Sequence, residues 1–476
     1  MKDRMMKYSY NEVIDTIQNT RRFGNLTGYD VSKRMLEQLG NPQSGIPFVH
    51  VAGTNGKGST TAFLCKILEQ TEKKVGMFTS PHLITFEERI RINGVYISKD
   101  DVTRLGNQLL EMEFDVSPTM FDYCLAMAVL YFKEQECDIM VMETGIGGRY
   151  DSTNALGMPE IAVITKIGFD HTAVLGETIE AIAGEKAGII KRGCPVVTSE
   201  QQPPAAEVLK NTFCEVNHLE NTEFVRTKQE WEERAGELNI FESAAIYMTS
   251  REDYRFAESI KMKMQTGYQI ENAATAIIAA KILLDKMKKD GKLKITSFDG
   301  ADAYIESCIR KGISETFWKG RMEIINEDPF FMIDGAHNSH GVLALAKSLQ
   351  ELYPNEKFHF IMGVMADKDY EEMIEALLPL AIDFITVTPE SNRALQSKDL
   401  AECIQKKGVK ARYAEDMEAV IRPLLPQKAT YQNTTIISKD SGKSHIYLPC
   451  SQHKIIAFGS LYFIGAIETM LEENSK

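Results

Sequence analysis

Short apolar runs alternate with longer amphipathic segments through the first part of the chain. The runs have the length of buried strands, whereas the longer segments repeat apolar residues every three or four positions, as helices do. Strands are expected at 46–51, 74–78, 139–142, 161–165 and 196–198, and helices at 10–20, 30–39, around 62–68, 99–113, 121–135 and 177–190. This alternation predicts an α/β fold whose mostly parallel sheet carries helices on both faces.

A change of pattern divides the chain into two parts. Polar and apolar residues alternate between 203 and 265, which predicts a small antiparallel patch, and a long helix is expected from 269 to 287. The charged stretch 288–292 contains a glycine and is typical of a domain boundary. We therefore predict a first domain over 1–298 and a second, smaller Rossmann-like α/β domain over 299–476.

The second domain is expected to repeat the alternating theme. Its predicted strands are 330–333, 357–362, 384–387 and 455–458, and its predicted helices are 342–352, 370–378, 397–406 and 415–424. The polar stretch 426–454 is expected to be a surface excursion.

In the first domain, the stretch 87–94 ends in an Asn-Gly turn signal and is expected to be a polar loop.

The first strand runs into a glycine-containing loop, Gly-Thr-Asn-Gly-Lys-Gly-Ser at 53–59, and a helix follows at once. This is the layout of a phosphate-binding loop, in which backbone N–H groups and the helix N-terminus face the anion and Lys57 adds a point charge. The general pattern G-x-x-x-x-G-K-[ST] is not matched letter for letter, because Gly58 separates Lys57 from Ser59. The alternative is that the glycines form only a tight connection between strand and helix.

Composition narrows the class of protein. The 476 residues suffice for two or three domains, and 43% hydrophobic with 25% charged residues is ordinary for a soluble globular protein. The net charge of −13 disfavours a nucleic-acid binder. An anionic substrate would then need local positive groups, for which the candidates are Lys57, Arg89, Arg91, Arg149 and Arg321.

Cysteines and hydropathy indicate the compartment. The eight cysteines are scattered without a C-x-x-C pair, as expected for reduced thiols. No run reaches the ~18–20 apolar residues of a membrane span, and no signal-peptide pattern opens the chain. We expect a cytoplasmic monomer that binds neither membrane nor nucleic acid.

Chemically equipped loops follow several of the predicted strands. They carry Lys57 with Ser59, Ser80 with His82, Glu143, and Asp170 with His171. Because ligands bind beyond the carboxyl ends of parallel strands, these side chains are expected to converge. Taken singly, a carboxylate there could cap a helix and a histidine could be structural. Together, hydroxyl, carboxylate and imidazole with several waters suit Mg²⁺ bridging nucleotide phosphates.

Further motifs follow the loop in order along nearly the whole chain. They are Thr-Ser-Pro-His-Leu at 79–83, Gly-Ile-Gly-Gly-Arg-Tyr-Asp-Ser-Thr-Asn at 145–154, Asp-His at 170–171, Glu-Lys-Ala-Gly-Ile-Ile-Lys at 185–191, Asp-Gly-Ala-His-Asn at 334–338 and Gly-Ser-Leu-Tyr at 459–462. With the loop, they resemble the motifs of the folylpolyglutamate synthase/dihydrofolate synthase family of the Mur ligase superfamily. The Ser-Pro-His and Gly-Gly-Arg motifs point to the folate branch.

The resemblance implies an ATP- and Mg²⁺-dependent ligase that joins L-glutamate to dihydropteroate or tetrahydrofolate through an acyl phosphate, and we favour a bifunctional enzyme. It implies catalytic roles for Lys57, Lys186 and His171, and metal ligation by Ser80, Glu143 and His171, with one or two Mg²⁺ ions. The implied ATP-binding residues are Asn55, Gly56, Lys57, Gly58, Ser59, Asn272, Arg321, Asp334 and His337, with Gln269 in the same segment as Asn272. The implied substrate-binding residues are Phe121, Tyr150, Asp151, Ser152 and Asp30.

Lys186 matches the family's carbamylated lysine. An unperturbed lysine near pKa ~10.4 reacts poorly with CO₂, so the site would have to lower this pKa. The alternative is a solvated lysine on a helix face. Likewise, Asp334 could be a helix N-cap, and the aromatic residues of the implied substrate pocket could belong to the core.

The chain departs from the family pattern at five positions. Ser339 and Lys319 stand where proline is usual, Tyr268 replaces histidine, Asp122 replaces glutamate and Thr144 replaces valine. None removes a catalytic group, but the position beside Phe121 leaves the folate form open.

Two other functions fit parts of the pattern. One is a Mur-type ligase acting on a cell-wall or other amino-acid polymer precursor, although no extra N-terminal domain for a UDP-sugar is evident. The other is a non-catalytic nucleotide-binding module, which would have no need of Lys186.

Overall fold

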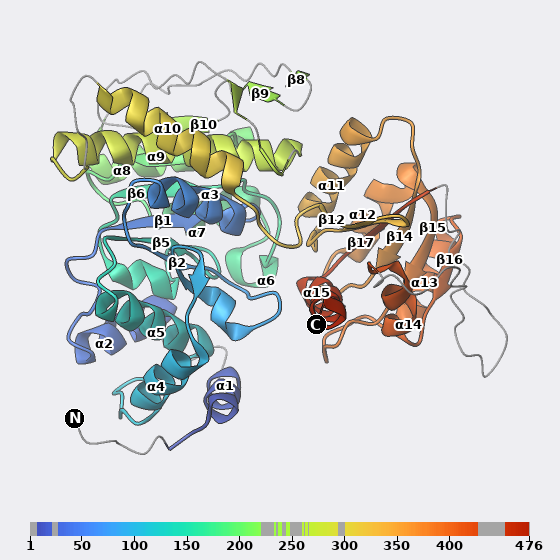
Figure 1. The fold of residues 1–476 in the computed structure, drawn as a ribbon, viewed down its shortest axis with the longest axis horizontal. Helices are drawn as coiled ribbons and strands as arrows, with labels where there is room; N and C mark the ends of the chain where they lie inside the picture. Colours follow the sequence, from blue (N-terminus) through green and yellow to red (C-terminus); the bar gives the residue numbers. More distant parts are fainter. Residues whose placement is uncertain are drawn as a thin grey trace. The chain divides into compact units, whose positions relative to one another are not determined.

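The chain forms two compact units in the computed structural model (Figure 1). The structure describes residues 7–20, 27–219, 233–234, 237–239, 244–247, 259–260, 262–264, 266–293, 300–426 and 453–475. The first unit comprises Met1–Gln265 and Gln269–Phe317, and the second comprises Thr266–Tyr268 and Trp318–Lys476.

The first unit is built on a sheet with strand order β10-β7-β6-β1-β5-β2-β3-β4 over the described residues. The strands are β1 (Phe48–Ala52), β2 (Val75–Phe78), β3 (Ile90–Ile92), β4 (Val95–Tyr96), β5 (Ile139–Glu143), β6 (Ile161–Ile164), β7 (Val196–Ser199) and β10 (Ala244–Tyr247). The central strands β7, β6, β1, β5 and β2 are parallel, as predicted, and antiparallel strands flank them. The stretch expected to be a polar loop supplies β3, and its Asn93-Gly94 turn with positive φ joins β3 to β4.

Helices cover both faces of this sheet (Figure 1). They are α1 (Tyr10–Gln18), α2 (Gly28–Gln38), α3 (Lys57–Glu69), α4 (Lys99–Leu110), α5 (Met120–Glu134), α6 (Thr172–Leu175), α7 (Ile179–Ala187), α8 (Pro203–Asn217), α9 (Gly267–Lys289) and α10 (Ala301–Glu315). Phe48, Met140 and Met142 share one core cluster with residues of α1, α2, α4 and α5. Ala52, Ala162 and Ile164 share another with α7 and α8. The helix after the glycine loop, α3, packs against β1, β2 and β5.

Three described helices of the first unit, α6, α8 and α10, were not predicted. Pro203 and Pro204 interrupt the apolar pattern, yet they open α8, where a missing N–H costs nothing. The antiparallel patch does form, from β8 (Glu233–Arg234), β9 (Glu237–Asn239) and β11 (Ser259–Ile260), but the neighbouring residues 240–243 lie outside the described chain. The unpredicted helix α10 packs on α3, so the first unit extends to Phe317 rather than to the expected residue 298.

The contact between α10 and α3 gives a stability prediction. A Cβ added at Gly312 would lie 2.5 Å from Ile67 Cα, which is backbone and cannot step aside cheaply. We expect Gly312→Ala to lower the free energy of unfolding by about 1–3 kcal/mol. Gly184→Ala in α7 meets nothing within 4 Å, so it should be neutral or stabilise by up to ~1 kcal/mol. Urea unfolding of both variants is the measurement, and equal stabilities would contradict a tight helix contact.

The second unit is a smaller α/β domain. Its sheet has the order β12-β13-β17-β14-β15-β16 over the described residues, parallel except for β12. The strands are β12 (Glu323–Glu327), β13 (Phe330–Ile333), β14 (Phe358–Met362), β15 (Ala381–Thr386), β16 (Ala411–Tyr413) and β17 (Lys454–Phe458), and the helices are α11 (Ser339–Leu352), α12 (Tyr370–Leu377), α13 (Ser397–Lys406), α14 (Met417–Ile421) and α15 (Leu461–Ser475). Strands β12 and β16 and helix α15 were not predicted. The expected excursion at 426–454 lies largely outside the described residues.

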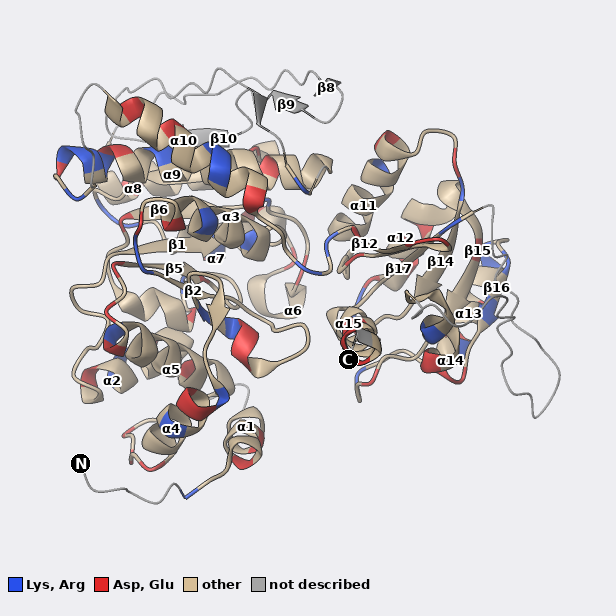
Figure 2. Ribbon diagram, in the orientation of Figure 1, with Lys and Arg blue, Asp and Glu red and all other residues tan. Residues whose placement is uncertain are grey.

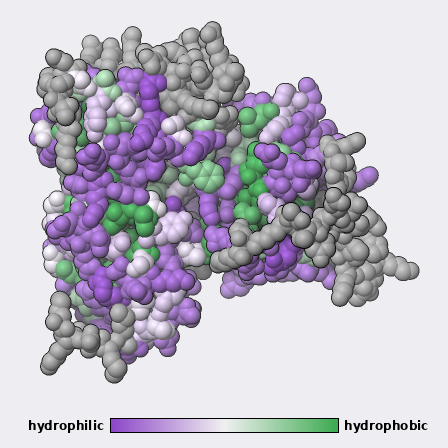
Figure 3. Space-filling model, viewed as in Figure 1, coloured by the Kyte–Doolittle hydropathy of each residue, from purple (hydrophilic) through white to green (hydrophobic). Residues whose placement is uncertain are grey.

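Surface composition agrees with the acidic sequence. Lys and Arg are interspersed with Asp and Glu along the helices and form no basic stripe in the view of Figure 2. The face drawn in Figure 3 is mostly hydrophilic, with apolar residues in small groups. No helix in the described chain is long and apolar enough to cross a membrane. The seven described cysteines are free thiols, and Cys450 lies outside the described residues.

Candidate active site

The loop between β1 and α3 has the backbone of a phosphate-binding loop. Gly56 has a φ of 88° in the left-handed region and immediately precedes the first turn of α3. The N–H groups of Thr54 and Asn55 both donate to the Lys166 carbonyl, at 3.0 and 3.3 Å, which ties the loop to the end of β6. The N-terminus of α3, with Lys57, Gly58 and Ser59, therefore stands at the carboxyl edge of the sheet, where it can face an anion.

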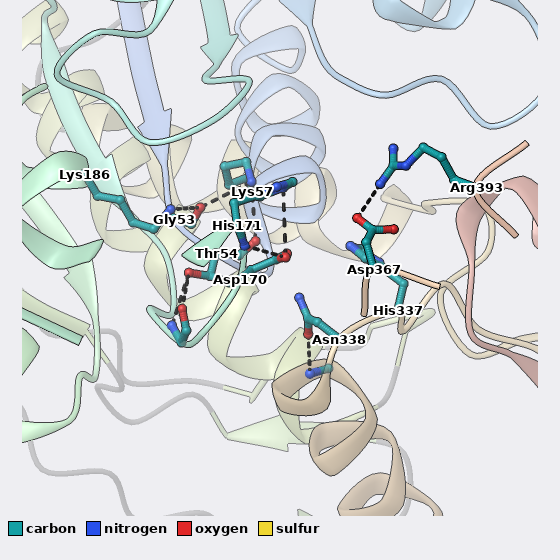
Figure 4. A network of polar contacts seen from close by, with 12 residues as sticks. Gly53, Thr54, Lys57, Asp170, His171, Lys186, His337, Asn338, Asp367 and Arg393 are labelled. Atoms are coloured by element: carbon teal, nitrogen blue, oxygen red, sulfur yellow. Dashed lines mark hydrogen bonds and ion pairs between the residues drawn. The ribbon is translucent and has the colours of Figure 1, made fainter. Parts of the chain in front are cut away.

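Two lysines meet at one carbonyl of this loop (Figure 4). Lys57 Nζ donates to the Gly53 oxygen at 3.2 Å, and Lys186 Nζ donates to the same oxygen at 2.8 Å. Lys186 is buried, with only 3% of its surface exposed, so it is not the solvated helix-face lysine of the alternative interpretation. Burial and the positive charge of Lys57 lower the pKa of Lys186 to about 7, against the opposing effect of nearby carboxylates.

The Gly-Gly-Arg motif brings Lys186 to this place. The Arg149 N–H donates to the Glu185 carbonyl at 2.7 Å, and an added Cβ at Gly188 would lie 2.3 Å from Arg149 Cα. A Cβ at Gly148 would lie 2.9 Å from the Lys186 carbonyl. The glycines are needed because the loop and the end of α7 pack backbone against backbone.

Ser80 and Glu143 lie together at the ends of the neighbouring strands β2 and β5. The Ser80 N–H donates to Glu143 Oε2 at 3.2 Å, and Glu143 is 4% exposed. His171 follows β6, precedes α6 with a φ of 50°, and lies 4.0 Å from Asp170 (Figure 4). In the described chain, no three His, Cys, Asp or Glu side chains cluster as a ready-made metal site. A hydroxyl and a carboxylate at one edge still suit Mg²⁺, which keeps several waters and takes ligands from phosphates.

The loop after Ser80 is fixed by residues that the sequence did not single out for this role. Glu88 accepts the N–H groups of Leu83, Ile84 and Thr85 at 2.7–2.9 Å. Arg89, expected as a candidate for an anionic substrate, is 6% exposed and donates from Nε to His82 Nδ1 at 2.8 Å. Burial and Arg89 lower the pKa of His82 to about 4, so the imidazole is neutral.

Helix α9 contributes two buried amides. Gln269 donates from Nε2 to Ser59 Oγ at 3.1 Å, and Asn272 donates from Nδ2 to Gln269 Oε1 at 3.1 Å. Asn272 also lies against the loop, since a Cβ on Gly56 would be 2.1 Å from Asn272 Oδ1. The structure therefore places both residues of this segment beside the phosphate loop.

The side chains of the expected substrate pocket have varied surroundings. Phe121 contacts Phe78, with ring centroids 5.6 Å apart, and lies against Gly145, so it stands next to the Gly-Gly-Arg loop. Tyr150 is 55% exposed, and Asp30 accepts from the Thr27 hydroxyl at 2.6 Å at the start of α2.

Asp151 and Ser152 are buried and occupied by hydrogen bonds. Asp151 accepts from the N–H groups of Gly145 and Ile146 and from Thr153. Ser152 donates to Asp122 at 2.7 Å. In this structure, the two residues stabilise the conformation of the loop. The sequence could not indicate this role, because Asp and Ser are equally suited to binding a substrate.

The second unit gathers its own candidates around Asp334, at the end of β13. This buried carboxylate accepts from the Tyr268 hydroxyl at 2.8 Å and from the N–H groups of Met322 and Ala336. Asp334 is not the N-cap of α11, since Asn338 takes that role. Arg321 contacts Gly335, and His337 Nδ1 lies 2.8 Å from the Gly335 carbonyl.

Comparison with known proteins identifies the class to which this fold and site belong. Residues 51–280 match the Mur ligase middle domain, and residues 320–438 match the Mur ligase glutamate ligase domain. The protein is thus a Mur-type α/β ligase by fold and by its phosphate loop.

Whole-chain relatives narrow the class. The chain is 33% identical over 475 residues to the dihydrofolate synthase/folylpolyglutamate synthase of Bacillus subtilis, covering 98% of this chain and 99% of that protein. It is 32% identical over 399 residues to the folylpolyglutamate synthase of Lacticaseibacillus casei, covering 81% and 87%. The folylpolyglutamate synthase of Mycobacterium tuberculosis, solved with ADP and AMPPCP, superposes with a TM-score of 0.73 at 26% identity over 93% of this chain and 95% of that one. The chain belongs to the folylpolyglutamate synthase/dihydrofolate synthase family.

Proposed function

We propose that the protein adds L-glutamate to the carboxylate of dihydropteroate and of tetrahydrofolate in an ATP-dependent reaction. The observation that carries this proposal is the meeting of Lys57 and the buried Lys186 at the Gly53 carbonyl of the phosphate loop. A non-catalytic nucleotide-binding module would gain nothing from burying a second lysine there. Membership of a family with both activities supports the bifunctional form.

A carboxylate resists attack by an amine until one of its oxygens is converted into a leaving group, so the reaction begins with phosphorylation of the carboxylate. A substrate carboxylate oxygen attacks the γ-phosphorus of ATP and ADP leaves, which yields an acyl phosphate. The glutamate amine then attacks the acyl carbon, phosphate leaves with the C–O electron pair, and the amine releases a proton. Lys57, the loop N–H groups and the N-terminus of α3 would hold and orient the phosphates, so catalysis rests mainly on positioning and charge neutralisation.

Mg²⁺ fits the residues at the sheet edge. Ser80, Glu143 and His171 would hold it, and Mg²⁺ would neutralise phosphate charge. The Glu143 carboxylate is the ligand that best supports this fit, because it is buried at the sheet edge beside Ser80 and a carboxylate oxygen suits a hard cation.

Lys186 is proposed to be carbamylated. Its neutral amine would add to CO₂ and lose a proton, which converts a cationic side chain into a carboxylate that would help to hold a second metal ion. A pKa of about 7 makes the neutral amine abundant near neutral pH, as this addition requires.

The remaining roles are proposed by the family match. Asn55, Gly56, Gly58, Ser59, Asn272, Arg321, Asp334 and His337 would bind ATP, and Phe121, Tyr150, Asp151, Ser152 and Asp30 would form the pterin site. For Asp151 and Ser152, the hydrogen bonds of the structure support an indirect role through the loop. We propose a cytoplasmic monomer.

The substrate assignment has a direct test. With ATP, Mg²⁺ and glutamate, we expect ADP release to rise well above background on adding dihydropteroate, and again on adding tetrahydrofolate. A response to one pterin alone would reject the bifunctional form. No response to either, with ADP still bound by the protein, would reject the folate assignment.

A further inference from the structure

We propose that Gln269 is a positioning residue that fixes the hydroxyl of Ser59, so that Ser59 donates its proton to a phosphate of the bound nucleotide. The inference deepens the proposed function and rests on it only for the identity of the nucleotide.

In the structure, the amide nitrogen of Gln269 faces the Ser59 hydroxyl, which makes Gln269 the donor of this hydrogen bond. Ser59 and Gln269 are buried, with 3% and 0% of their surfaces exposed, and Gln269 Nε2 lies 3.1 Å from Ser59 Oγ. An amide nitrogen only donates, so the bond uses a lone pair of the hydroxyl and leaves its proton free to point elsewhere. Among the described residues, the Ser59 hydroxyl accepts this hydrogen bond from Gln269 and donates none. The proton of Ser59 is therefore available for an acceptor beside the loop.

Asn272 determines which way the Gln269 amide faces. Asn272 Nδ2 donates to Gln269 Oε1 at 3.1 Å, and Asn272 Oδ1 lies on the side of Gly56. If the Gln269 amide turned over while Asn272 kept its orientation, two NH₂ groups would face one another, and Gln269 Oε1 would accept the Ser59 proton instead of leaving it free. Asn272 thus donates to Gln269, and Gln269 donates to Ser59 in the first turn of α3.

The arrangement is more than packing of α9 on the loop. A helix that served only to support the sheet could place an apolar residue at this position, as it does at Ala273, Ala276 and Ile277. A buried amide in place of an apolar residue is stable only when its polar atoms are paired, and here one of its partners is the loop serine.

A double-mutant cycle tests this inference through ADP affinity, which does not require turnover. Gln269→Met removes the donor at similar length, and we expect it to weaken ADP binding, measured by calorimetry, about fivefold, the effect of one hydrogen bond. Ser59→Ala should weaken binding at least as much. The double variant should bind no more weakly than Ser59→Ala alone, because Gln269 acts through Ser59.

Gln269→Glu replaces the hydrogen-bond donor with an acceptor in a side chain of the same shape. Its carboxylate would accept the Ser59 proton and turn it away from the nucleotide, so we expect weaker binding than in Gln269→Met. Lys289→Met, at the exposed end of α9, is the matched control and should bind ADP normally. Additive losses in the cycle, or Gln269→Glu binding as well as the original protein, would overturn the proposal. If ADP binds as expected but pterins never stimulate turnover, the proposed function fails and the inference stands.

Discussion

Lys186→Ala is expected to reduce turnover by about 10²–10³-fold or more, while ADP still binds. The ammonium or carbamate of this buried side chain supplies a charge beside the phosphate loop that a water molecule in the space left by alanine would not supply. The phosphate loop keeps Lys57 and its N–H groups in the variant, so nucleotide affinity should be largely retained. ADP release in the presence of pterin and glutamate, together with calorimetric ADP binding, separates the two effects.

The control for this variant is Lys191→Ala. Lys191 lies just beyond α7, half-buried, and donates to the Gly188 carbonyl at 3.1 Å rather than to the phosphate loop. We expect its loss to leave turnover within about twofold, as surface substitutions do. Normal turnover in Lys186→Ala would mean that Lys186 has a structural role and no catalytic one.

The pH dependence of the unmodified protein follows from the same lysine. Because its folded pKa is lowered to about 7, Lys186 is mostly an ammonium below pH 7 and mostly a neutral amine above it. Only the neutral amine adds CO₂, so turnover should rise between about pH 6 and 8 and respond to added bicarbonate. A flat profile with no bicarbonate effect would argue against carbamylation.

The sequence predicted the parallel strands of the central sheet well, because they depend on local patterns. Apolar runs of strand length mark β1, β5 and β6, and parallel strands must present their carboxyl ends together. That rule predicted that the loops carrying Ser80 and Glu143 meet at one edge, and the Ser80 backbone N–H does donate to Glu143 Oε2 there.

The remainder depends on contacts between distant residues. The pairing of Gln269 with Ser59 spans 210 positions, and a glutamine inside a helix gives no sign of its partner. Burial of Lys186 was equally invisible, since a lysine in a helix is usually solvated. The helix α10 lay beyond the expected boundary because the charged linker before it looked like the end of a domain, whereas its packing on α3 is tertiary.

The surroundings of individual glycines could not be predicted from the sequence either. Gly56 and Gly45 both precede elements of the first unit and both have positive φ, at 88° and 84°. Only the structure distinguishes them, because an added Cβ at Gly56 would lie 2.1 Å from Asn272 Oδ1, whereas nothing lies within 4 Å at Gly45. The two glycines therefore form a matched pair with similar positive φ angles and unequal surroundings.

Gly56→Ala is expected to lower turnover about 100-fold and to weaken ADP binding, whereas Gly45→Ala should change neither. Each substitution should cost about 1–2 kcal/mol of stability for alanine in the left-handed region. At Gly56 the methyl group must also displace Asn272, which releases Gln269 and with it the Ser59 hydroxyl. Urea unfolding measures the shared strain, and ADP binding with pterin-dependent ADP release measures the difference. Equal loss of function in both variants would mean that backbone strain, rather than the contact with Asn272, makes glycine necessary in the phosphate loop.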